Sequence, residues 1–300
     1  MVFRPMLASD AVEKTIRYPK IMMPKIDGAR GLFHERFSAR SLKNFDNKHT
    51  QKRFSDPMYS GLDGELVLGS PTAENVCTET SSALRTHAGE PDINWHVFDY
   101  IGLSMLEAPY VNRLEAAAGI VEERVLSARN TGLKLVPWRL VKSHDEMLAW
   151  EEDLLELNYE GVILRDPMAP YKCGRSTARE QGLLRIKRFV EEDAIILGFE
   201  EAQENKNAAV VNELGLSKRS THAGNMVGKG VVGTILAVTV KDNTEIRVGP
   251  GTLTHAARAE IFADQEKYIG KRFKYKHFPR GVKNKPRFPT FADWRADFDR

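Results

Sequence analysis

Apolar residues recur along the first two thirds of the chain at both helical and strand spacings. Residues 111–128 carry them at intervals of three and four, which predicts an amphipathic helix, and residues 72–85 and 145–157 are also expected to be helical. Asp10 and Glu13 have the spacing of a capping box, which predicts a helix start at residues 9–13. Short apolar runs bounded by turn residues predict strands at 21–25, 30–34, 61–68, 93–101, 133–141, 161–164 and 183–187.

The pattern changes after about Phe189. Short strands are expected at 194–199, 233–240 and 244–248, followed by a helix near 254–266 and a basic strand. Closely spaced short strands with turn residues between them are typical of a small barrel. We therefore predict two domains, residues 1–189 and residues 190–300. Residues 203–229 are long for a connection within a small barrel and are expected to form an insertion.

Composition and charge narrow the class of protein only modestly. Hydrophobic residues make up 42% of the chain and charged residues 28%, as in ordinary globular proteins. No apolar run approaches the length of a membrane helix, and the N-terminus has no secretory signal pattern. Cys77 and Cys173 lie far apart, which favours a reduced, cytoplasmic protein, and the histidines show no metal-ligand spacing.

Residues 271–287 contain eight lysines and arginines and no acidic residue, although the net charge of the chain is only +3. Aromatic residues are interleaved with these cations at Phe273, Tyr275 and Phe278. Such a segment is either a solvated basic strand or a surface that binds phosphates. Composition does not decide between the two interpretations.

The segment Lys25-Ile26-Asp27-Gly28-Ala29-Arg30 carries coherent chemistry for nucleotidyl transfer. A lysine amine attacks phosphorus only when it is uncharged, and desolvation or neighbouring cations favour that form. Gly28 would allow the backbone to approach a nucleotide closely, and Arg30 would hold a phosphate or a ribose. The alternative is a surface turn with a Lys–Asp pair, because short motifs often occur by chance.

Further motifs follow this one in a fixed order. They are Ser38-Ala39-Arg40-Ser41, Asp63-Gly64-Glu65-Leu66, Phe98-Asp99-Tyr100, Glu160-Gly161-Val162-Ile163-Leu164-Arg165, Leu184-Arg185-Ile186-Lys187, and Arg287-Phe288-Pro289 with Arg295-Ala296-Asp297. Over nearly its whole length the chain resembles the covalent nucleotidyltransferase superfamily, and specifically the short ATP-dependent DNA ligases of viral type. The resemblance implies an α+β fold, with a nucleotidyltransferase (adenylation) domain of antiparallel sheets flanked by helices and a C-terminal OB-fold β-barrel.

The resemblance also implies the chemistry of the site. Lys25 becomes covalently linked to AMP from ATP, and Phe98 stacks on the adenine. Glu65 binds the ribose hydroxyl. Glu160 binds the catalytic Mg²⁺, which Mn²⁺ can replace in sites of this kind. Asp27 contacts the 3′-hydroxyl of a nick or a metal. Without the resemblance, Phe98 would be ordinary strand core and the glutamates solvated strand ends.

The basic residues of the motifs are expected to bind phosphates. Arg30 and Arg40 hold the sugar and phosphate, later including the 5′-phosphate of the nick, and Lys187 neutralises the α-phosphate as pyrophosphate leaves. Arg185 stands where the family usually has a lysine, which keeps the charge but changes the geometry. Arg287 and Arg295 orient the departing pyrophosphate. Taken singly, each of these residues would be ordinary solvated surface.

The insertion at residues 203–229 is expected to contact DNA through Lys218, Arg219 and Lys229, the alternative being a solvated, disordered loop. Within it, residues 224–230 resemble a P-loop. The glycine spacing is one residue short, and Gly230 replaces the Ser or Thr that would bind magnesium. We therefore interpret residues 224–230 as part of a mobile or DNA-facing loop.

Several alternatives to a DNA ligase share some of these features. An mRNA-capping guanylyltransferase uses the same lysine chemistry, but its counterpart of Glu160-Gly161-Val162 usually begins with Asp. An RNA ligase would be distinguished by its substrate. An NAD-dependent ligase is disfavoured because only 24 residues precede Lys25. A non-catalytic OB-fold nucleic-acid-binding protein would explain the basic C-terminal segment but not the glutamate motifs. We expect a monomer acting on nicked duplex DNA, in a bacterial cytosol or that of a virus-infected host.

Overall fold

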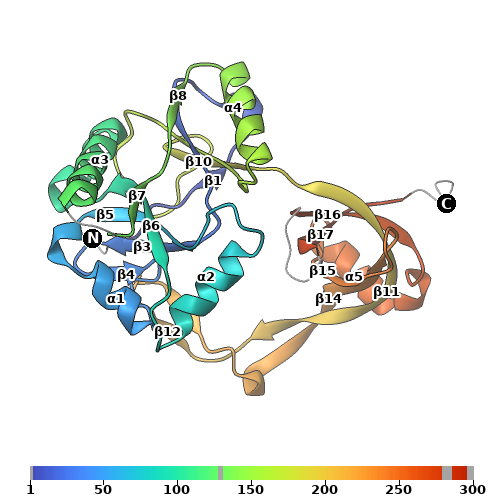
Figure 1. Ribbon diagram of the computed structural model, residues 1–300. Helices are drawn as coiled ribbons and strands as arrows, with labels where there is room; N and C mark the ends of the chain where they lie inside the picture. The colour runs from blue at the N-terminus through green and yellow to red at the C-terminus, as the bar shows by residue number, and fades with distance from the viewer. Residues whose placement is uncertain (1–2, 128–130, 279–285, 296–300) are drawn as a thin grey trace. The chain divides into compact units, whose positions relative to one another are not determined.

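A computed structural model describes residues 3–127, 131–278 and 286–295 (Figure 1). The chain divides into two compact units, which are treated separately below. The first unit comprises Met1–Lys187 with Glu213–Gly215, and the second comprises Arg188–Asn212 with Leu216–Arg300. Within the described ranges, no helix is both long and apolar enough to cross a membrane.

Two five-stranded sheets form the framework of the first unit. The strand order of one sheet is β1 (Ser9–Asp10), β10 (Leu183–Lys187), β9 (Gly161–Arg165), β2 (Lys20–Pro24) and β8 (Arg139–Val141). The order of the other is β4 (Phe37–Ala39), β3 (Ala29–Phe33), β5 (Leu62–Leu68), β6 (Ile93–Tyr100) and β7 (Leu133–Leu135). Pairing is antiparallel except between β1 and β10 and between β6 and β7. The predicted α+β class with mainly antiparallel sheets is confirmed.

Helices cover these sheets. Of the four α-helices given next, the last three lie close to the positions predicted from the apolar spacing, whereas the first was not predicted. They are α1 (Lys48–Phe54), α2 (Val76–Arg85), α3 (Tyr110–Ser127) and α4 (His144–Glu156), with short 3₁₀ turns η1 (Glu13–Thr15), η2 (Pro57–Tyr59) and η3 (Leu103–Met105). The Ser143 side chain caps α4 by accepting a hydrogen bond from the Glu146 backbone N–H. Edge-to-face packing of Phe37 and Phe54 on Trp95, with ring centroids 5.0 and 5.4 Å away, fills the core between α1 and its sheet.

Two sequence predictions in the first unit were wrong. The expected helix start at residues 9–13 is strand β1 followed by η1, because the Asp10 carboxylate binds Arg185 on the neighbouring strand instead of capping a helix. The single strand expected at 133–141 is two strands, β7 and β8, which join different sheets. Pro137 lies between them, and a proline has no N–H for a strand ladder.

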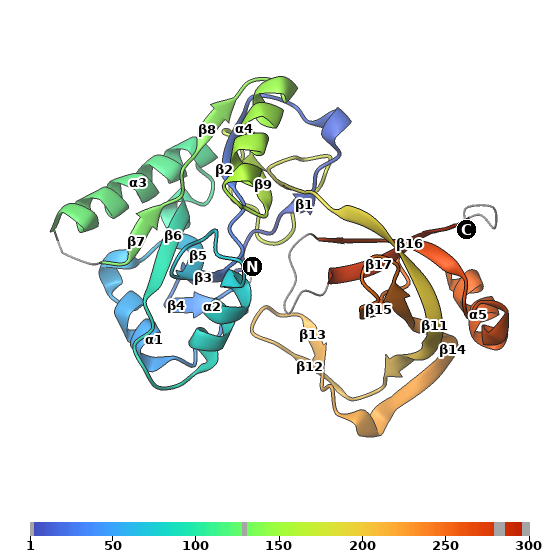
Figure 2. The same ribbon diagram turned by 45° about the vertical axis from the view of Figure 1, so that its right-hand side comes forward.

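The second unit is a five-stranded antiparallel barrel (Figure 2). Its order is β15 (Glu245–Val248), β14 (Met226–Thr239), β11 (Val190–Asn205), β16 (Arg272–Phe278) and β17 (Arg287–Trp294). A bridge between Gly249 and Thr290 joins the two edges. Helix α5 (His255–Ala263) and turn η5 (Gln265–Lys267) lie between β15 and β16. The predicted C-terminal barrel is confirmed.

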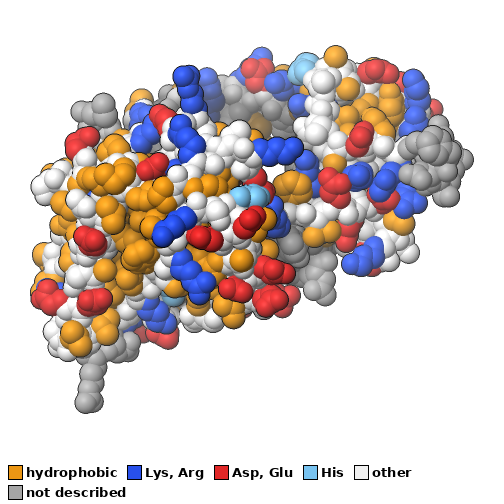
Figure 3. All heavy atoms as spheres, turned by 90° about the horizontal axis from the view of Figure 1, so that it is seen from above, with side chains coloured by type: hydrophobic (Ala, Val, Ile, Leu, Met, Phe, Trp, Pro, Cys, Tyr) orange, Lys and Arg blue, Asp and Glu red, His pale blue; other side chains and the backbone are white. Residues whose placement is uncertain are grey.

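The interleaved aromatic and basic residues of β16 reflect the two faces of a barrel strand. Phe273 and Tyr275 are fully buried in the barrel core, whereas Lys274 and Lys276 are partly exposed. Residues 279–285 of the predicted basic segment lie outside the described residues. On the face of the molecule in Figure 3, basic and acidic side chains are interspersed.

The predicted insertion projects from the long β11–β14 ribbon, whose pairing extends to Asn205 and Met226. It contains the hairpin β12 (Ala209–Val211) and β13 (Ser217–Arg219) and the turn η4 (Ala223–Asn225). Residues 226–230 begin strand β14, and Met226, Val227 and Gly228 pair with β11, so the mobile loop expected at residues 224–230 was wrong, whereas contact of this segment with DNA stays a prediction. Since a strand follows the glycines instead of a helix, the segment is not a P-loop.

Candidate active site

A cavity of about 600 Å³ opens in the first unit, within the size range of nucleotide and other small-molecule sites. Six of the residues selected from the sequence line it: Lys25, Arg30, Arg40, Glu65, Phe98 and Arg185. They come from segments far apart in the chain, so the fold, and not proximity in sequence, brings them together.

Lys25 directly follows β2 and is held by β9. Its backbone N–H donates a 2.8 Å hydrogen bond to the Gly161 carbonyl, and its Nζ donates to Oε2 of Glu160. The Lys25 side chain is 17% exposed and the Glu160 side chain 6%, so the amine reaches the cavity while its partner carboxylate is nearly buried. The register between β2 and β9 therefore fixes the lysine beside the glutamate.

Lys187, the last residue of β10, donates from its Nζ to the other oxygen of the same carboxylate, Oε1 of Glu160. Register between β9 and β10 pairs Lys187 with Gly161, which places the lysine next to Glu160. Burial and the nearby charge of Lys25 lower the pKa of Lys187. Glu160 thus holds the Nζ atoms of both lysines next to each other, and clustered lysines of this kind stabilise negative charge on phosphate oxygens.

Two glycines permit the close backbone packing on which this geometry depends. A Cβ on Gly28 would lie 2.2 Å from the carbonyl oxygen of Leu66, and one on Gly161 would lie 2.2 Å from that of Ile186. A Cβ atom and a non-bonded carbonyl oxygen do not approach this closely in proteins, so only glycine fits at either position. The glycines of the lysine and Glu160 motifs are therefore required by packing.

Arg30 lies in the cavity wall in a bidentate pair with buried Asp63. Its Nε and Nη2 are 2.8 and 2.5 Å from the two carboxylate oxygens, and its Nη1 donates to the Met6 carbonyl. Burial opposes the charge on Arg30, but the Asp63 carboxylate outweighs it and raises the pKa of Arg30. The guanidinium carbon lies 5.4 Å from the centroid of the Phe98 ring. Arg30 is therefore fixed, charged and adjacent to the aromatic ring.

Glu65, the register partner of Arg30 on β5, is partly buried in the cavity wall. Burial raises the pKa of Glu65 to about 7, although the charges of Lys25 and Arg30 act in the opposite direction. The Asp27 carboxylate is close enough to contribute to this increase. Glu65 can therefore accept or donate a hydrogen bond near neutral pH.

Arg185 and Arg40 extend the basic character of the cavity lining. The Arg185 Nε lies 2.6 Å from Oδ1 of Asp10, and Nη2 lies 3.3 Å from Oδ2. Arg40 follows β4 and is exposed. The remaining residues selected from the sequence, Lys218, Arg219, Lys229, Arg287 and Arg295, belong to the second unit. Arg295 binds Asp193 there at 2.9 Å, and Asp297 lies outside the described residues.

Comparison with known proteins identifies the family. The sequence model described as "ATP dependent DNA ligase domain" matches residues 5–187, more than half of the chain. The chain belongs to the ATP-dependent DNA ligase family. The model described as "DNA ligase OB-like domain" matches residues 223–295 of this ligase-family chain. The family resemblance inferred from the motifs is confirmed.

Individual relatives are distant. A DNA ligase of African swine fever virus is 22% identical over 150 residues, covering 50% of this chain and 34% of the viral protein. A probable DNA ligase of Rhodococcus jostii is 27% identical over 256 residues, covering 75% and 46%. A structure of Chlorella virus DNA ligase-adenylate aligns over 99% of both chains, with 25% identity and a TM-score of 0.57. The chain thus spans about a third of the first of these curated relatives.

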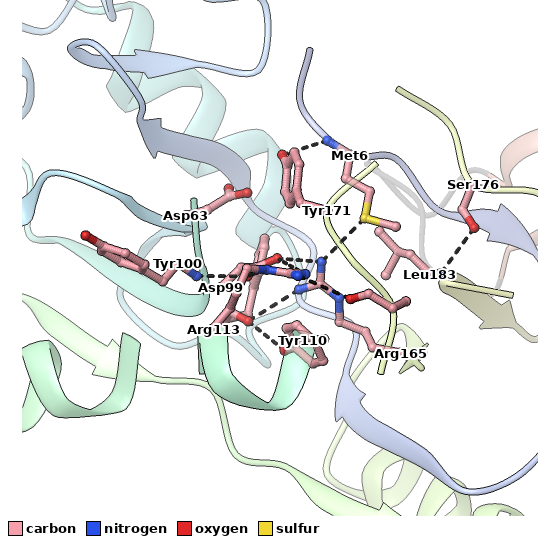
Figure 4. A network of polar contacts seen from close by, with 12 residues as sticks. Met6, Asp63, Asp99, Tyr100, Tyr110, Arg113, Arg165, Tyr171, Ser176 and Leu183 are labelled. Carbon is pink, nitrogen blue, oxygen red and sulfur yellow. Dashed lines mark hydrogen bonds and ion pairs between the residues drawn. The ribbon is translucent and has the colours of Figure 1, made fainter. Parts of the chain in front are cut away.

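The sequence analysis of this ligase-family protein missed a buried network that joins Asp99 to Arg113 and Arg165 (Figure 4). The Phe98 carbonyl accepts a 2.7 Å hydrogen bond from the Tyr110 hydroxyl, and the Asp99 carboxylate lies 2.9 Å from Arg113 and 2.7 Å from Arg165. Arg165 also lines the cavity. It ends the motif that begins at Glu160, and an arginine closing a buried apolar strand was the signal available in the sequence.

The residues present fit a hard divalent cation only if the nucleotide supplies further ligands. Among the residues that the structure describes, no group of three or more His, Cys, Asp or Glu side chains could hold a metal. Glu160 offers one nearly buried carboxylate at the cavity lysine. Mg²⁺ commonly binds through one or two carboxylates, substrate phosphates and water, so this donor set suits it.

Proposed function

We propose that the protein is an ATP-dependent DNA ligase that seals 5′-phosphate/3′-hydroxyl nicks in duplex DNA through a covalent Lys25–AMP intermediate. One observation carries the proposal: the Lys25 amine enters a nucleotide-sized cavity while hydrogen-bonded to a carboxylate that also binds Lys187. Family membership and the lining of the cavity by Glu65, Phe98 and Arg30 support it.

In this proposal the cavity binds ATP. Phe98 stacks on the adenine, with the positions of its ring and backbone supported by Arg30 and Tyr110. Glu65 binds the ribose hydroxyls, as its ability to accept or donate a hydrogen bond near neutral pH allows. Arg40 and Arg185 contact phosphates, and Arg287 and Arg295 of the second unit orient the departing pyrophosphate.

The first transfer forms a bond between Lys25 Nζ and the α-phosphorus of ATP and breaks the bond from that phosphorus to pyrophosphate. Nζ must lose a proton first, and its hydrogen bond to Glu160 provides an acceptor. The Lys187 ammonium stabilises negative charge on the α-phosphate oxygens. Glu160 would also hold Mg²⁺, which when bound neutralises charge on the phosphate oxygens.

The second and third transfers use the nick. Its 5′-phosphate attacks the phosphorus of the lysine-linked AMP and releases Lys25, with Arg40 holding the phosphate. The 3′-hydroxyl then attacks the activated 5′-phosphate, which forms the phosphodiester and expels AMP. Asp27 contacts the 3′-hydroxyl in this last transfer. The covalent intermediate divides one difficult reaction into easier ones.

We assign adenylation to residues 1–189 and DNA contact to residues 190–300, whose insertion grips the duplex through Lys218, Arg219 and Lys229. All three residues are exposed on the second unit, as phosphate contacts require. The protein is proposed to act as a monomer in the cytoplasm of a bacterium or a virus-infected cell, where its free cysteines, Cys77 and Cys173, would stay reduced.

Nick sealing with separate nucleotides tests the proposal. A 5′-phosphorylated nicked duplex should be sealed with ATP but not with GTP or NAD, and Lys25→Ala should retain no label from α-labelled ATP. Labelling by GTP would instead support a capping guanylyltransferase, and sealing of RNA alone an RNA ligase. Failure to label with any nucleotide would leave a non-catalytic nucleic-acid-binding protein.

A further inference from the structure

The hairpin β12–β13 has no hydrophobic core of its own to order it. Its strands pair only with each other, through the register pairs Ala209–Arg219, Val210–Lys218 and Val211–Ser217. Val210 and Val211 are 60% and 78% exposed. An isolated two-stranded hairpin is marginal in water, so its order must come from elsewhere.

Asn207, at the base of the hairpin, supplies a set of side-chain hydrogen bonds. Within residues 206–225, all of which are described, Asn207 alone is buried. Its Nδ2 lies 2.9 to 3.0 Å from the Asn205 side-chain oxygen and the carbonyls of Ser220 and His222, and its Oδ1 accepts from Asn225 at 3.2 Å. These contacts, which we call the Asn207 clasp, join both ends of the insertion.

The clasp also uses one of the cations assigned to DNA. Arg219 donates from Nη1 to the backbone carbonyl of Asn207, while Asn205 donates from Nδ2 to the Ser220 carbonyl at 2.7 Å. Lys218 is the register partner of Val210, so its side chain leaves the opposite face of the hairpin from that of Arg219. One face of the hairpin is thus tied down at its base and the other carries an exposed lysine.

We infer that Asn207 is a positioning residue for DNA, which holds the hairpin in the orientation that presents Lys218 to a phosphate backbone. The inference rests on the proposed function of the insertion. A buried side-chain amide that forms hydrogen bonds to several partners at once fixes the conformation of a loop. Moving the loop would leave these polar groups without hydrogen bonds, which costs free energy. Without the clasp, only a fraction of the molecules holds the hairpin in the orientation that binds DNA. The apparent affinity for DNA falls in proportion to that fraction.

A residue that positions the hairpin and a residue that contacts a phosphate should affect the salt dependence of DNA binding differently. The slope of log K against log salt counts phosphate contacts, at about 0.9 for each. Asn207→Ala should weaken binding to a nicked duplex that lacks the 3′-hydroxyl about tenfold, with the wild-type slope. Lys218→Ala should lower the slope by about 0.9. The exposed neighbour Thr221→Ala serves as the matched control and should bind as the wild type does.

Hydrogen exchange provides the second measurement. Asn207→Ala should speed exchange across residues 206–219 while protection in β14 and lysine labelling by ATP stay unchanged, whereas Lys218→Ala should leave exchange unaltered. Wild-type affinity or wild-type exchange in Asn207→Ala would overturn the inference, as would a slope lowered as in Lys218→Ala or lost protection in β14. Unchanged affinity in both variants would instead refute the proposed DNA grip itself.

Discussion

The Nε of Arg185 lies 2.6 Å from Oδ1 of Asp10, and the two residues are register partners on β10 and β1. Arg185 Nη2 faces the second oxygen of the same carboxylate, so two nitrogens of the guanidinium are already engaged. What remains for a phosphate in the cavity is positive charge and a single further nitrogen. The arginine that departs from the family's lysine therefore offers the nucleotide little more than a lysine would.

Arg185→Lys should accordingly keep lysine labelling by ATP within about threefold of the wild type, whereas Arg185→Ala should lower it about tenfold. Single-turnover labelling at subsaturating ATP measures both. Since Arg185 is partly exposed and its partner Asp10 is exposed, neither change should alter the free energy of unfolding by more than about 1 kcal/mol. A loss in Arg185→Lys as large as that in Arg185→Ala would mean that the guanidinium fork itself binds the nucleotide.

Lys187→Ala should slow labelling at saturating ATP by at least about 100-fold, because it removes the charge that we propose stabilises the α-phosphate oxygens. Lys172 offers a matched control, since it is a half-exposed lysine paired with Glu180 and does not line the cavity. Lys172→Ala should label at the wild-type rate. Equal rates for both variants would exclude Lys187 from the first transfer.

The stability of the protein should depend on pH through Glu65. Its pKa rises from 4.5 to about 7 on folding, so the folded state binds the proton more tightly than the unfolded state does. The stabilisation is complete below pH 4.5 and is lost as pH rises through 7. The difference corresponds to on the order of 3 kcal/mol.

Glu65→Gln removes this contribution, because the amide does not titrate. The difference in free energy of unfolding between wild type and Glu65→Gln, measured by urea denaturation below and above pH 7, should therefore shift in favour of the variant as pH rises. A difference that does not vary with pH would show that Glu65 is ionised throughout.

Gly28→Ala should destabilise the first unit by about 1 to 3 kcal/mol, because the new methyl group would meet the Leu66 carbonyl. Gly119 provides the opposite control, since it lies exposed in α3 with no atom within 4 Å of an added Cβ. Gly119→Ala should stabilise by about 0.5 to 1 kcal/mol. Urea midpoints measure both, and a stable Gly28→Ala protein would remove the packing argument for this glycine.

Much of the fold followed from local patterns, because the apolar spacing of α3 and α4 and of strands such as β6 matches their burial. Errors arose where tertiary contacts decided the outcome. Asp10 has the local signature of a helix start, but its carboxylate binds Arg185, a residue distant in sequence. Residues 226–230 are rich in glycine, yet pairing with β11 makes them a strand.

The ordered motifs also identified residues that the fold places around one cavity. They did not indicate which side chains would form hydrogen bonds with one another. Nothing in the spacing of the motifs indicates that Lys25 and Lys187 share the carboxylate of Glu160, since that depends on the register of β2, β9 and β10. The contact of Tyr110 with the Phe98 carbonyl was missed for the same reason. The residue types indicated the chemistry of the site, whereas the contacts between its side chains could be found only from the register of the sheet.

The most direct test of the account is to locate the AMP. Wild-type protein incubated with ATP and Mg²⁺ should gain one AMP, and peptide mass spectrometry should find it on Nζ of Lys25. Lys172→Ala should carry the same modification, and Lys25→Ala none. AMP attached to another residue, or a wild-type protein that never acquires it, would contradict the central claim.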